Sequence, residues 1–255
     1  MDSDELRDLL ASVGGERQAN KDGKNDGEIA APWDEIDRRP RRMMRPVRVR
    51  ATPGGTVDFR IISYSFYNSF NYSAFASNGR EPLRMSLGIT SPNGGEGKTT
   101  TACNLATALS MGLGSRTIVV DLNLTKPRIH GVFGIPKGPG LAEAMVGDDI
   151  CIAPTHLENL YVLPVGNVSI LSPGKFSTFR EILASLFKEF EFVIVDMPSA
   201  GARGFPTLIA NQLNGLLVVL RAKVTRRKEI DRVFRKVSED KVLGFVINGV
   251  QDDDL

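Results

Sequence analysis

From about residue 57 onward, short continuous apolar runs alternate with longer segments of helical periodicity. Each apolar run has the length of a strand and is hydrophobic at nearly every position, which is typical of strands buried on both faces of a parallel sheet. The predicted strands are 83–90, 116–121, 160–164, 192–196, 216–220 and 242–247. The predicted helices are 99–111, 141–146, 177–190 and 226–238. This order predicts an α/β fold, with a mostly parallel sheet, helices on both faces and a ligand at the carboxyl ends of the strands.

A glycine-rich turn, SPNGGEGKTT at residues 91–100, joins the first predicted strand to the first predicted helix. Glycines allow successive backbone N–H groups to point at one anion, and the helix adds its positive N-terminal end. Pro92 stands where the strict G-x-x-x-x-G-K-[ST] pattern has its first glycine, so the flanking strand and helix carry part of the prediction. We predict a phosphate-binding loop that takes ATP through Gly94, Gly95, Glu96, Gly97, Lys98, Thr99 and Thr100.

Two predicted strands end in an aspartate, Asp121 and Asp196. Both carboxylates are expected at the sheet edge that carries Lys98, which we predict to contact the β and γ phosphates. Mg²⁺ prefers a few carboxylates, hydroxyls and phosphate oxygens, so Thr99, Asp121 and Asp196 are the predicted metal-binding residues. Lys98, Asp121 and Asp196 are the predicted catalytic residues, acting by positioning and charge neutralisation. Either aspartate taken alone is also compatible with a turn residue or a helix cap.

The first 56 residues differ in composition from the rest of the chain. They hold 11 basic and 11 acidic side chains and few large apolar ones. Such a segment cannot bury enough surface to fold alone, so we predict a weakly ordered arm at 1–56 and one domain at 57–255. Residues 2–13 carry leucines and a valine at helical spacing, which fits either a short docking helix or a frayed helix without contacts.

Seven arginines and no acidic residue lie within residues 38–50. Such a patch fits an anionic membrane surface or an acidic partner, and it also fits a solvated linker. No base-reading or RNA-binding motif accompanies these arginines, so we expect no nucleic acid partner.

The composition of the 255 residues, 42% hydrophobic and 24% charged, is that of an ordinary globular protein. No run approaches the roughly 18 apolar residues that a membrane span needs. The acidic start lacks the layout of a secretory signal, and Cys103 and Cys151 have no metal or redox spacing, so a reducing cytoplasm is the expected location.

Residues 57–250 resemble the CpsD/CapB-type bacterial tyrosine kinases of capsule and exopolysaccharide synthesis, which are related to the MinD/ParA ATPases. The phosphate loop, DLNLTKP at 121–127, FVIVDMPSA at 192–200 and LGFVINGV at 243–250 carry the resemblance. It implies a three-layer P-loop NTPase fold with ATP and Mg²⁺ as cofactors. It also implies that Asn248 faces the adenine.

The same resemblance implies partners. Family members without membrane spans of their own rely on a membrane-integral polysaccharide chain-length regulator as activator. The protein is then expected at the inner face of the plasma membrane through this partner. A homo-oligomer is a further expectation, although the family's E-x-x-R-x-x-R helix aligns with Val57, Arg60 and Ser63 and keeps only the middle arginine.

Several positions depart from the kinase pattern. The family's second aspartate is Asn123 here, and an amide cannot accept a proton or bring negative charge to Mg²⁺. The chain ends in QDDDL where these kinases have a tyrosine-rich tail that is phosphorylated in trans. Tyr64, Tyr67 and Tyr72 are substitute acceptors only if they are not the packing face of a helix.

The sequence therefore predicts a Mg–ATP-binding tyrosine kinase that regulates polysaccharide polymerisation or export. Asn123 and the missing tail favour the alternative of a nucleotide-dependent binding module with weak or no phosphotransfer. A MinD-type positioning ATPase is a third hypothesis. Asn93, which stands where those ATPases carry their signature lysine, argues against it.

Overall fold

The computed structural model describes residues 47–48 and 84–250, which form one twisted sheet covered by helices. The strand order is β1-β8-β7-β2-β6-β3-β5-β4. Every neighbouring pair is parallel except β4 with β5. The predicted α/β class with a mostly parallel sheet is confirmed.

The elements follow the predicted order closely. The strands are β1 Val47–Arg48, β2 Met85–Thr90, β3 Thr117–Asp121, β4 Ala153–Pro154, β5 Leu160–Leu163, β6 Phe192–Asp196, β7 Gly215–Arg221 and β8 Val242–Asn248. The helices are α3 Lys98–Leu113, α4 Ile129–Phe133, α5 Leu141–Val146, α6 Phe179–Leu186, α7 Thr207–Gln212 and α8 Arg227–Phe234. Short 3₁₀ turns occupy η1 Val168–Ile170, η2 Pro173–Thr178 and η3 Glu239–Lys241.

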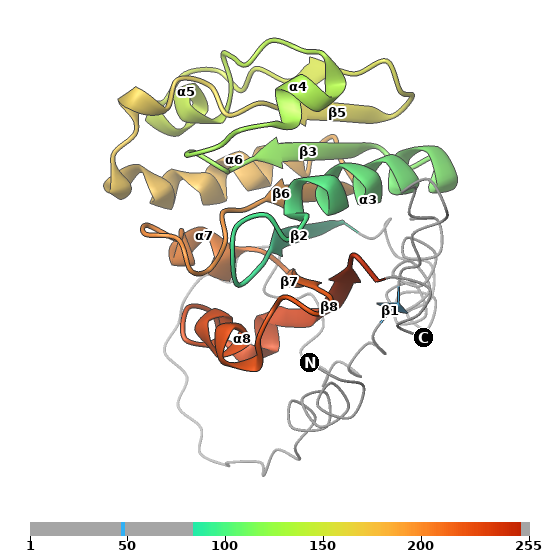
Figure 1. The fold of residues 1–255 in the computed structure, drawn as a ribbon. Coiled ribbons are helices and arrows are strands. Elements are labelled where there is room, and N and C mark those ends of the chain that lie inside the picture. Colours follow the sequence, from blue (N-terminus) through green and yellow to red (C-terminus); the bar gives the residue numbers. More distant parts are fainter. Residues whose placement is uncertain (1–46, 49–83, 251–255) are drawn as a thin grey trace, which may run out of the picture.

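Two hydrophobic cores, one on each face of the sheet, make the fold three layers deep (Figure 1). Strands β2, β3 and β6 are buried along their whole length, as the continuous apolar runs predict. Successive side chains alternate between the faces: Val119 packs with α3 and α4, whereas Ile118 and Val120 pack with α5 to α8. The sheet therefore holds its carboxyl edge rigidly from both sides.

The helix boundaries differ from the prediction in places. Helix α6 begins at Phe179 because the preceding residues of the predicted 177–190 helix belong to the 3₁₀ turn η2, and α8 ends at Phe234 rather than at residue 238. Helices α4 and α7, of five and six residues, were not predicted, although the equally short α5 was. At the start of α4, the backbone N–H groups of Arg128 and Ile129 donate to the carboxylate of Asp121.

Several predictions concern residues outside the described ranges. These are most of the 1–56 arm with its 2–13 helix and the 38–50 arginines, the segment that contains Tyr64, Tyr67 and Tyr72, and the QDDDL end. Within the arm, Val47–Arg48 pairs with β8, and the proposed boundary at residue 56 stays a prediction. In the part of the chain that the structure covers, no helix combines the length and the apolar character needed to cross a bilayer.

Helix α3 should be the element whose packing most directly supports the phosphate loop. Leu105 is fully buried between this helix and the sheet, so Leu105→Ala should lower the free energy of unfolding by about 2–5 kcal/mol. Met111, on the same helix but 63% exposed, provides the control, and Met111→Ala should stay within about 0.5 kcal/mol of wild type. Urea unfolding measures both, and equal effects would contradict the proposed packing.

Candidate nucleotide-binding site

The phosphate loop lies between β2 and α3 at the carboxyl edge of the sheet, as predicted (Figure 1). Gly95 and Gly97 have φ angles of 81° and 101°, in the left-handed region that side chains rarely adopt. A Cβ on Gly97 would lie 2.1 Å from the Asn248 amide nitrogen. Glycine is therefore required at position 97 both by the backbone and by its neighbour.

Glu96 anchors the loop from inside the protein. Its buried carboxylate accepts hydrogen bonds from the Asn93 backbone N–H at 2.9 Å and from the Thr225 hydroxyl at 2.6 Å. The Asn248 side chain donates to the Glu96 carbonyl at 3.0 Å. The loop is thus tied to the β7–α8 turn and to the end of β8, and any contact of Glu96 with a nucleotide falls to its backbone.

Lys98 and Thr99 open helix α3 next to the loop. The ammonium of Lys98 is buried and lies 3.5 Å from the Asn93 carbonyl, inside the curve of the loop. The Thr99 hydroxyl donates to Oδ2 of Asp196 at 2.6 Å. The fold therefore brings Asp196 next to Thr99, which lies 97 residues before it in the sequence, at the site where both were predicted.

Asp121 lies beside Asp196 in the register of β3 and β6. Its Oδ1 accepts from the Asn123 backbone N–H at 3.1 Å, and its Oδ2 accepts from those of Arg128 and Ile129, both at 3.1 Å. The carboxylate thus caps the start of α4, the helix-cap role that the sequence left open. Its predicted roles in binding a metal and in catalysis stay predictions.

Burial dominates the electrostatics of the two aspartates. It raises the pKa of Asp121, against the three backbone N–H bonds, and raises the pKa of Asp196 to about 7. The Thr99 hydrogen bond and the Lys98 charge lower the pKa of Asp196, and the neighbouring Asp121 raises it further. Burial lowers the pKa of Lys98, with Asp196 and Glu96 opposing the shift. Burial therefore disfavours the charged form of all three groups, and a single ammonium faces two carboxyl groups.

The residues present fit a divalent cation. Oδ1 of Asp196 is buried and has no hydrogen-bond partner among the described residues, although unpaired buried carboxylate oxygens are rare. A hydroxyl, Thr99, lies on the other oxygen of the same carboxylate. A hard cation such as Mg²⁺ prefers this kind of oxygen donor and would satisfy the unpaired atom.

The remaining predicted residues have varied surroundings. Gly94 and Thr100 are exposed at the mouth of the loop. Asn248 reaches the loop backbone, and its predicted contact with adenine is not tested by this geometry. Sequence reasoning missed Thr225, because a threonine 129 residues from Glu96 carries no local signal of the hydrogen bond between them.

Comparison with known proteins identifies the family of the chain. Residues 87–255, more than half of the chain, match the family described as CobQ/CobB/MinD/ParA nucleotide binding domain. Tyrosine-protein kinase CpsD of Streptococcus agalactiae serotype III (strain NEM316) is 29% identical over 179 residues, which cover 65% of this chain and 75% of that protein.

Two solved structures have similar folds. The kinase domain of the Escherichia coli tyrosine kinase ETK aligns with a TM-score of 0.63 at 20% identity, covering 87% of this chain and 88% of that one. The septum site-determining protein MinD of Pyrococcus horikoshii OT3, complexed with Mg-ADP, aligns with a TM-score of 0.57 at 25% identity over 68% of this chain and 74% of that one. The predicted three-layer P-loop NTPase fold is confirmed.

The raised pKa of Asp196 makes a prediction about stability without nucleotide or metal. The folded state holds the proton up to a pH of about 7, whereas the unfolded state releases it near 3.8. This contribution to stability is therefore complete below pH 3.8 and is lost as the pH rises through 7, by at most about 4 kcal/mol. Asp196→Asn removes the titration.

Relative to wild type, the Asp196→Asn variant should become progressively more stable between pH 4 and pH 8. Thermal unfolding in EDTA at several pH values measures the difference. A difference that stays constant over this range would show that Asp196 does not bind its proton as described.

Proposed function

The chain belongs to the CobQ/CobB/MinD/ParA nucleotide-binding domain family, and on this premise we propose that it binds Mg–ATP and phosphorylates protein tyrosine in a capsular or exopolysaccharide system. The observation that carries the proposal is the buried Asp196 with one unpaired oxygen, hydrogen-bonded to Thr99 beside the glycine loop. The kinase activity, rather than nucleotide binding alone, is suggested by the similarity to tyrosine-protein kinase CpsD.

We propose a role for each part of the loop. The triphosphate would lie against the backbone N–H groups that Gly95 and Gly97 turn inward and against the N-terminus of α3. Lys98 would place its ammonium on the β and γ phosphates. Thr99 and Asp196 would hold Mg²⁺, which when bound neutralises charge that develops on the phosphate oxygens.

A proton must leave the tyrosine hydroxyl during transfer, and Asp121 is the carboxylate available next to Asp196. Burial raises the pKa of Asp121 and so strengthens it as a base, although its oxygens are already engaged by three backbone N–H bonds that oppose this shift. Asn123 follows two residues later and cannot accept a proton. These observations favour slow phosphotransfer and make a nucleotide-dependent binding module the second candidate function.

The partners follow from the same proposal. A membrane-integral polysaccharide chain-length regulator would activate the protein and hold it at the inner face of the plasma membrane. Arg38 to Arg50 would add contact with anionic lipid, and copies of the chain would assemble with one another. These are proposals from the resemblance, and the cytoplasmic location is part of them.

The decisive assay follows labelled γ-phosphate from ATP, with Mg²⁺, in the presence and absence of the partner's cytoplasmic segment. Lys98→Met should reduce tyrosine labelling by at least about a hundredfold, because it removes a charge aimed at the transferred phosphate. Lys188→Met, which changes an exposed lysine after α6, is the matched control and should label like wild type.

The other outcomes identify the alternatives. ATP binding without tyrosine labelling would support the binding module. Release of free phosphate that lipid vesicles stimulate, again without labelled tyrosine, would support a MinD-type positioning ATPase. No binding of a purine nucleotide with Mg²⁺ in calorimetry would contradict all three.

Asn123 allows a gain-of-function prediction. Its side-chain oxygen accepts from the Thr125 hydroxyl and the Lys126 backbone N–H, both at 3.3 Å, and an aspartate can accept the same bonds. Asn123→Asp should therefore fold normally, add a third carboxylate to the pair Asp121 and Asp196, and raise tyrosine labelling about tenfold or more.

Asn123→Ala is the control, since it removes the amide without adding charge. Labelling that is the same in Asn123→Asp, Asn123→Ala and wild type would show that position 123 does not limit transfer.

A further inference from the structure

One short segment carries the whole basic excess of the described domain. Residues 84–250 hold 19 basic and 14 acidic side chains, and residues 221–236 alone hold eight basic and two acidic ones. The remainder of residues 84–250 is therefore close to neutral, with 11 basic and 12 acidic side chains. The basic segment comprises the end of β7, the following turn and helix α8.

Helix α8 presents this charge outward in a fixed orientation. Ile230 and Val233 are fully buried against the sheet, and Phe234 packs edge-on against Phe245 of β8 with ring centroids 6.4 Å apart. Lys228, Arg232 and Arg235 are spaced four and three residues apart, so they form a stripe on the opposite, exposed face of the helix. The basic face therefore cannot turn inward.

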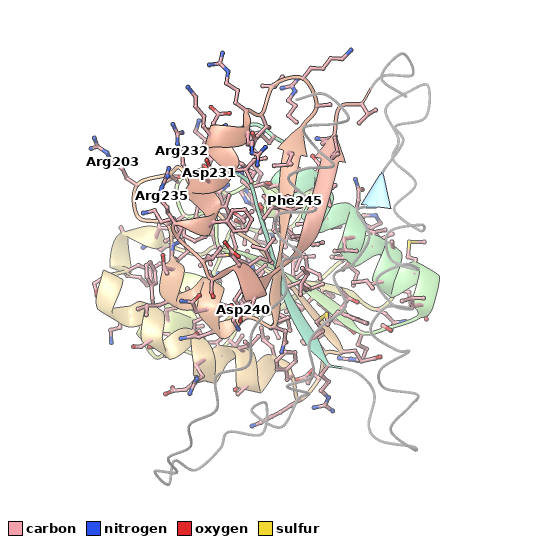
Figure 2. The ribbon with its side chains drawn as sticks, turned by 90° about the horizontal axis from the view of Figure 1, so that it is seen from below. Arg203, Asp231, Arg232, Arg235, Asp240 and Phe245 are labelled. Carbon is pink, nitrogen blue, oxygen red and sulfur yellow. The ribbon has the colours of Figure 1, made fainter. Side chains whose placement is uncertain are left out.

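The loop before α7 extends the surface. Gly201 lies beside α8, since a Cβ built on it would be 4.0 Å from the Arg232 guanidinium. Figure 2 shows Arg203 of this loop on the same side of the molecule as Arg232 and Arg235, all three directed away from the sheet, with Asp231 between the α8 arginines. We call residues 221–236 together with Arg203 the α8 surface.

The positions of these charges are unfavourable for the helix itself. Arg226, Arg227 and Lys228 occupy the N-cap and the first turn of α8, where the positive end of the helix dipole repels cations. Glu229 is the acidic residue of that turn, and it is used internally: the Arg226 N–H and the Asn93 side chain, which lower its pKa, bond to it. The Arg226 and Arg232 charges help to lower the pKa of Glu229, but the other cations of this turn gain nothing from the helix dipole, so an external anion is their natural explanation.

An apolar side chain distinguishes between kinds of anion. Val224 in the turn is 57% exposed, with Lys223 on one side and Arg226, Arg227 and Lys228 shortly after it. Basic residues that surround an exposed apolar one are typical of surfaces that touch lipid headgroups and the acyl boundary together. A nucleic acid backbone or an acidic peptide would use the charges but leave the valine in water.

We propose that the α8 surface docks on an anionic phospholipid membrane, with the basic side chains on the headgroups and Val224 at the acyl boundary. The docking is separate from the 38–50 arginines and does not depend on nucleotide binding or on phosphotransfer. The surface adjoins the phosphate loop, because Thr225 bonds to Glu96 and Asn93 bonds to Glu229, so the docked protein would hold its nucleotide edge close to the membrane.

The test is sedimentation of the full chain with vesicles, without nucleotide. Vesicles of phosphatidylcholine containing 30 mol% phosphatidylglycerol, a composition chosen for the assay, are compared with phosphatidylcholine alone. Because each basic side chain near an anionic surface strengthens binding about fivefold, the triple variant Arg227→Glu, Lys228→Glu, Arg235→Glu should bind at least about a hundredfold more weakly. Val224→Ser should weaken binding a few-fold.

The matched control reverses three exposed lysines elsewhere, Lys137→Glu, Lys175→Glu and Lys188→Glu, so that the net charge is identical. Both triple variants are also made with the seven arginines of residues 38–50 changed to serine, so that the arm does not mask the effect. Thermal unfolding verifies that each variant is folded. The single variant Lys228→Ala, with an expected loss of about fivefold, serves if the triple variant unfolds.

The proposal is overturned by equal losses in the two triple variants, or by equal binding to the neutral and anionic vesicles. It is also overturned if an acidic peptide or duplex DNA binds through Arg227, Lys228 and Arg235 while vesicles do not. A kinase assay with no activity leaves it untouched, because the vesicle assay contains no nucleotide.

Discussion

The site depends on a buried carboxylate that the protein leaves incompletely paired. Asp196 ends a strand at the centre of the sheet, where both faces are covered and water is excluded. One of its oxygens accepts a hydrogen bond from the Thr99 hydroxyl, and the other has no hydrogen-bond partner among the described residues. Burying such a group costs free energy unless a cation or a proton compensates it, and its pKa of about 7 reflects this. Asp196 is therefore the place in the described domain where a proton or a cation has the most to compensate.

The phosphate loop keeps its shape next to this carboxylate because residues from other segments of the chain bond to it. Gly95 and Gly97 adopt the left-handed φ angles that the turn requires, and the buried Glu96 holds the loop in that shape through Asn93 and Thr225. The anchors come from the β7–α8 turn and from the end of β8, so two sequence-distant segments enforce a conformation that glycine alone merely permits. A nucleotide would therefore meet a preorganised cradle, which lowers the entropic cost of binding.

Phosphotransfer, unlike nucleotide binding, would depend on the groups that can accept a proton. Asp121 is used as a cap for α4, and the next polar position on that strand end is an amide, Asn123. A site of this kind would position and neutralise a triphosphate, but its candidate base is already engaged as a helix cap. The proposed kinase and the proposed binding module share everything except this step. The basic α8 surface beside the loop fits either function, since both would operate at a membrane.

Short-range pattern was sufficient for the fold class, for six of the strands and for the phosphate loop with Lys98 and Thr99. Strand burial, glycine conformation and the position of a lysine at a helix start depend on neighbours within a few residues, and those are written locally in the chain. Asp121 and Asp196 were also placed correctly at the sheet edge, because parallel strands bring their carboxyl ends together.

Long-range contacts settled the rest. The Glu96–Thr225 hydrogen bond and the bond from Asn248 to the Glu96 carbonyl each join segments whose spacing along the chain carries no signal. Their partners are chosen by packing in three dimensions, where burial and hydrogen-bond geometry act on residues that local periodicity treats as unrelated.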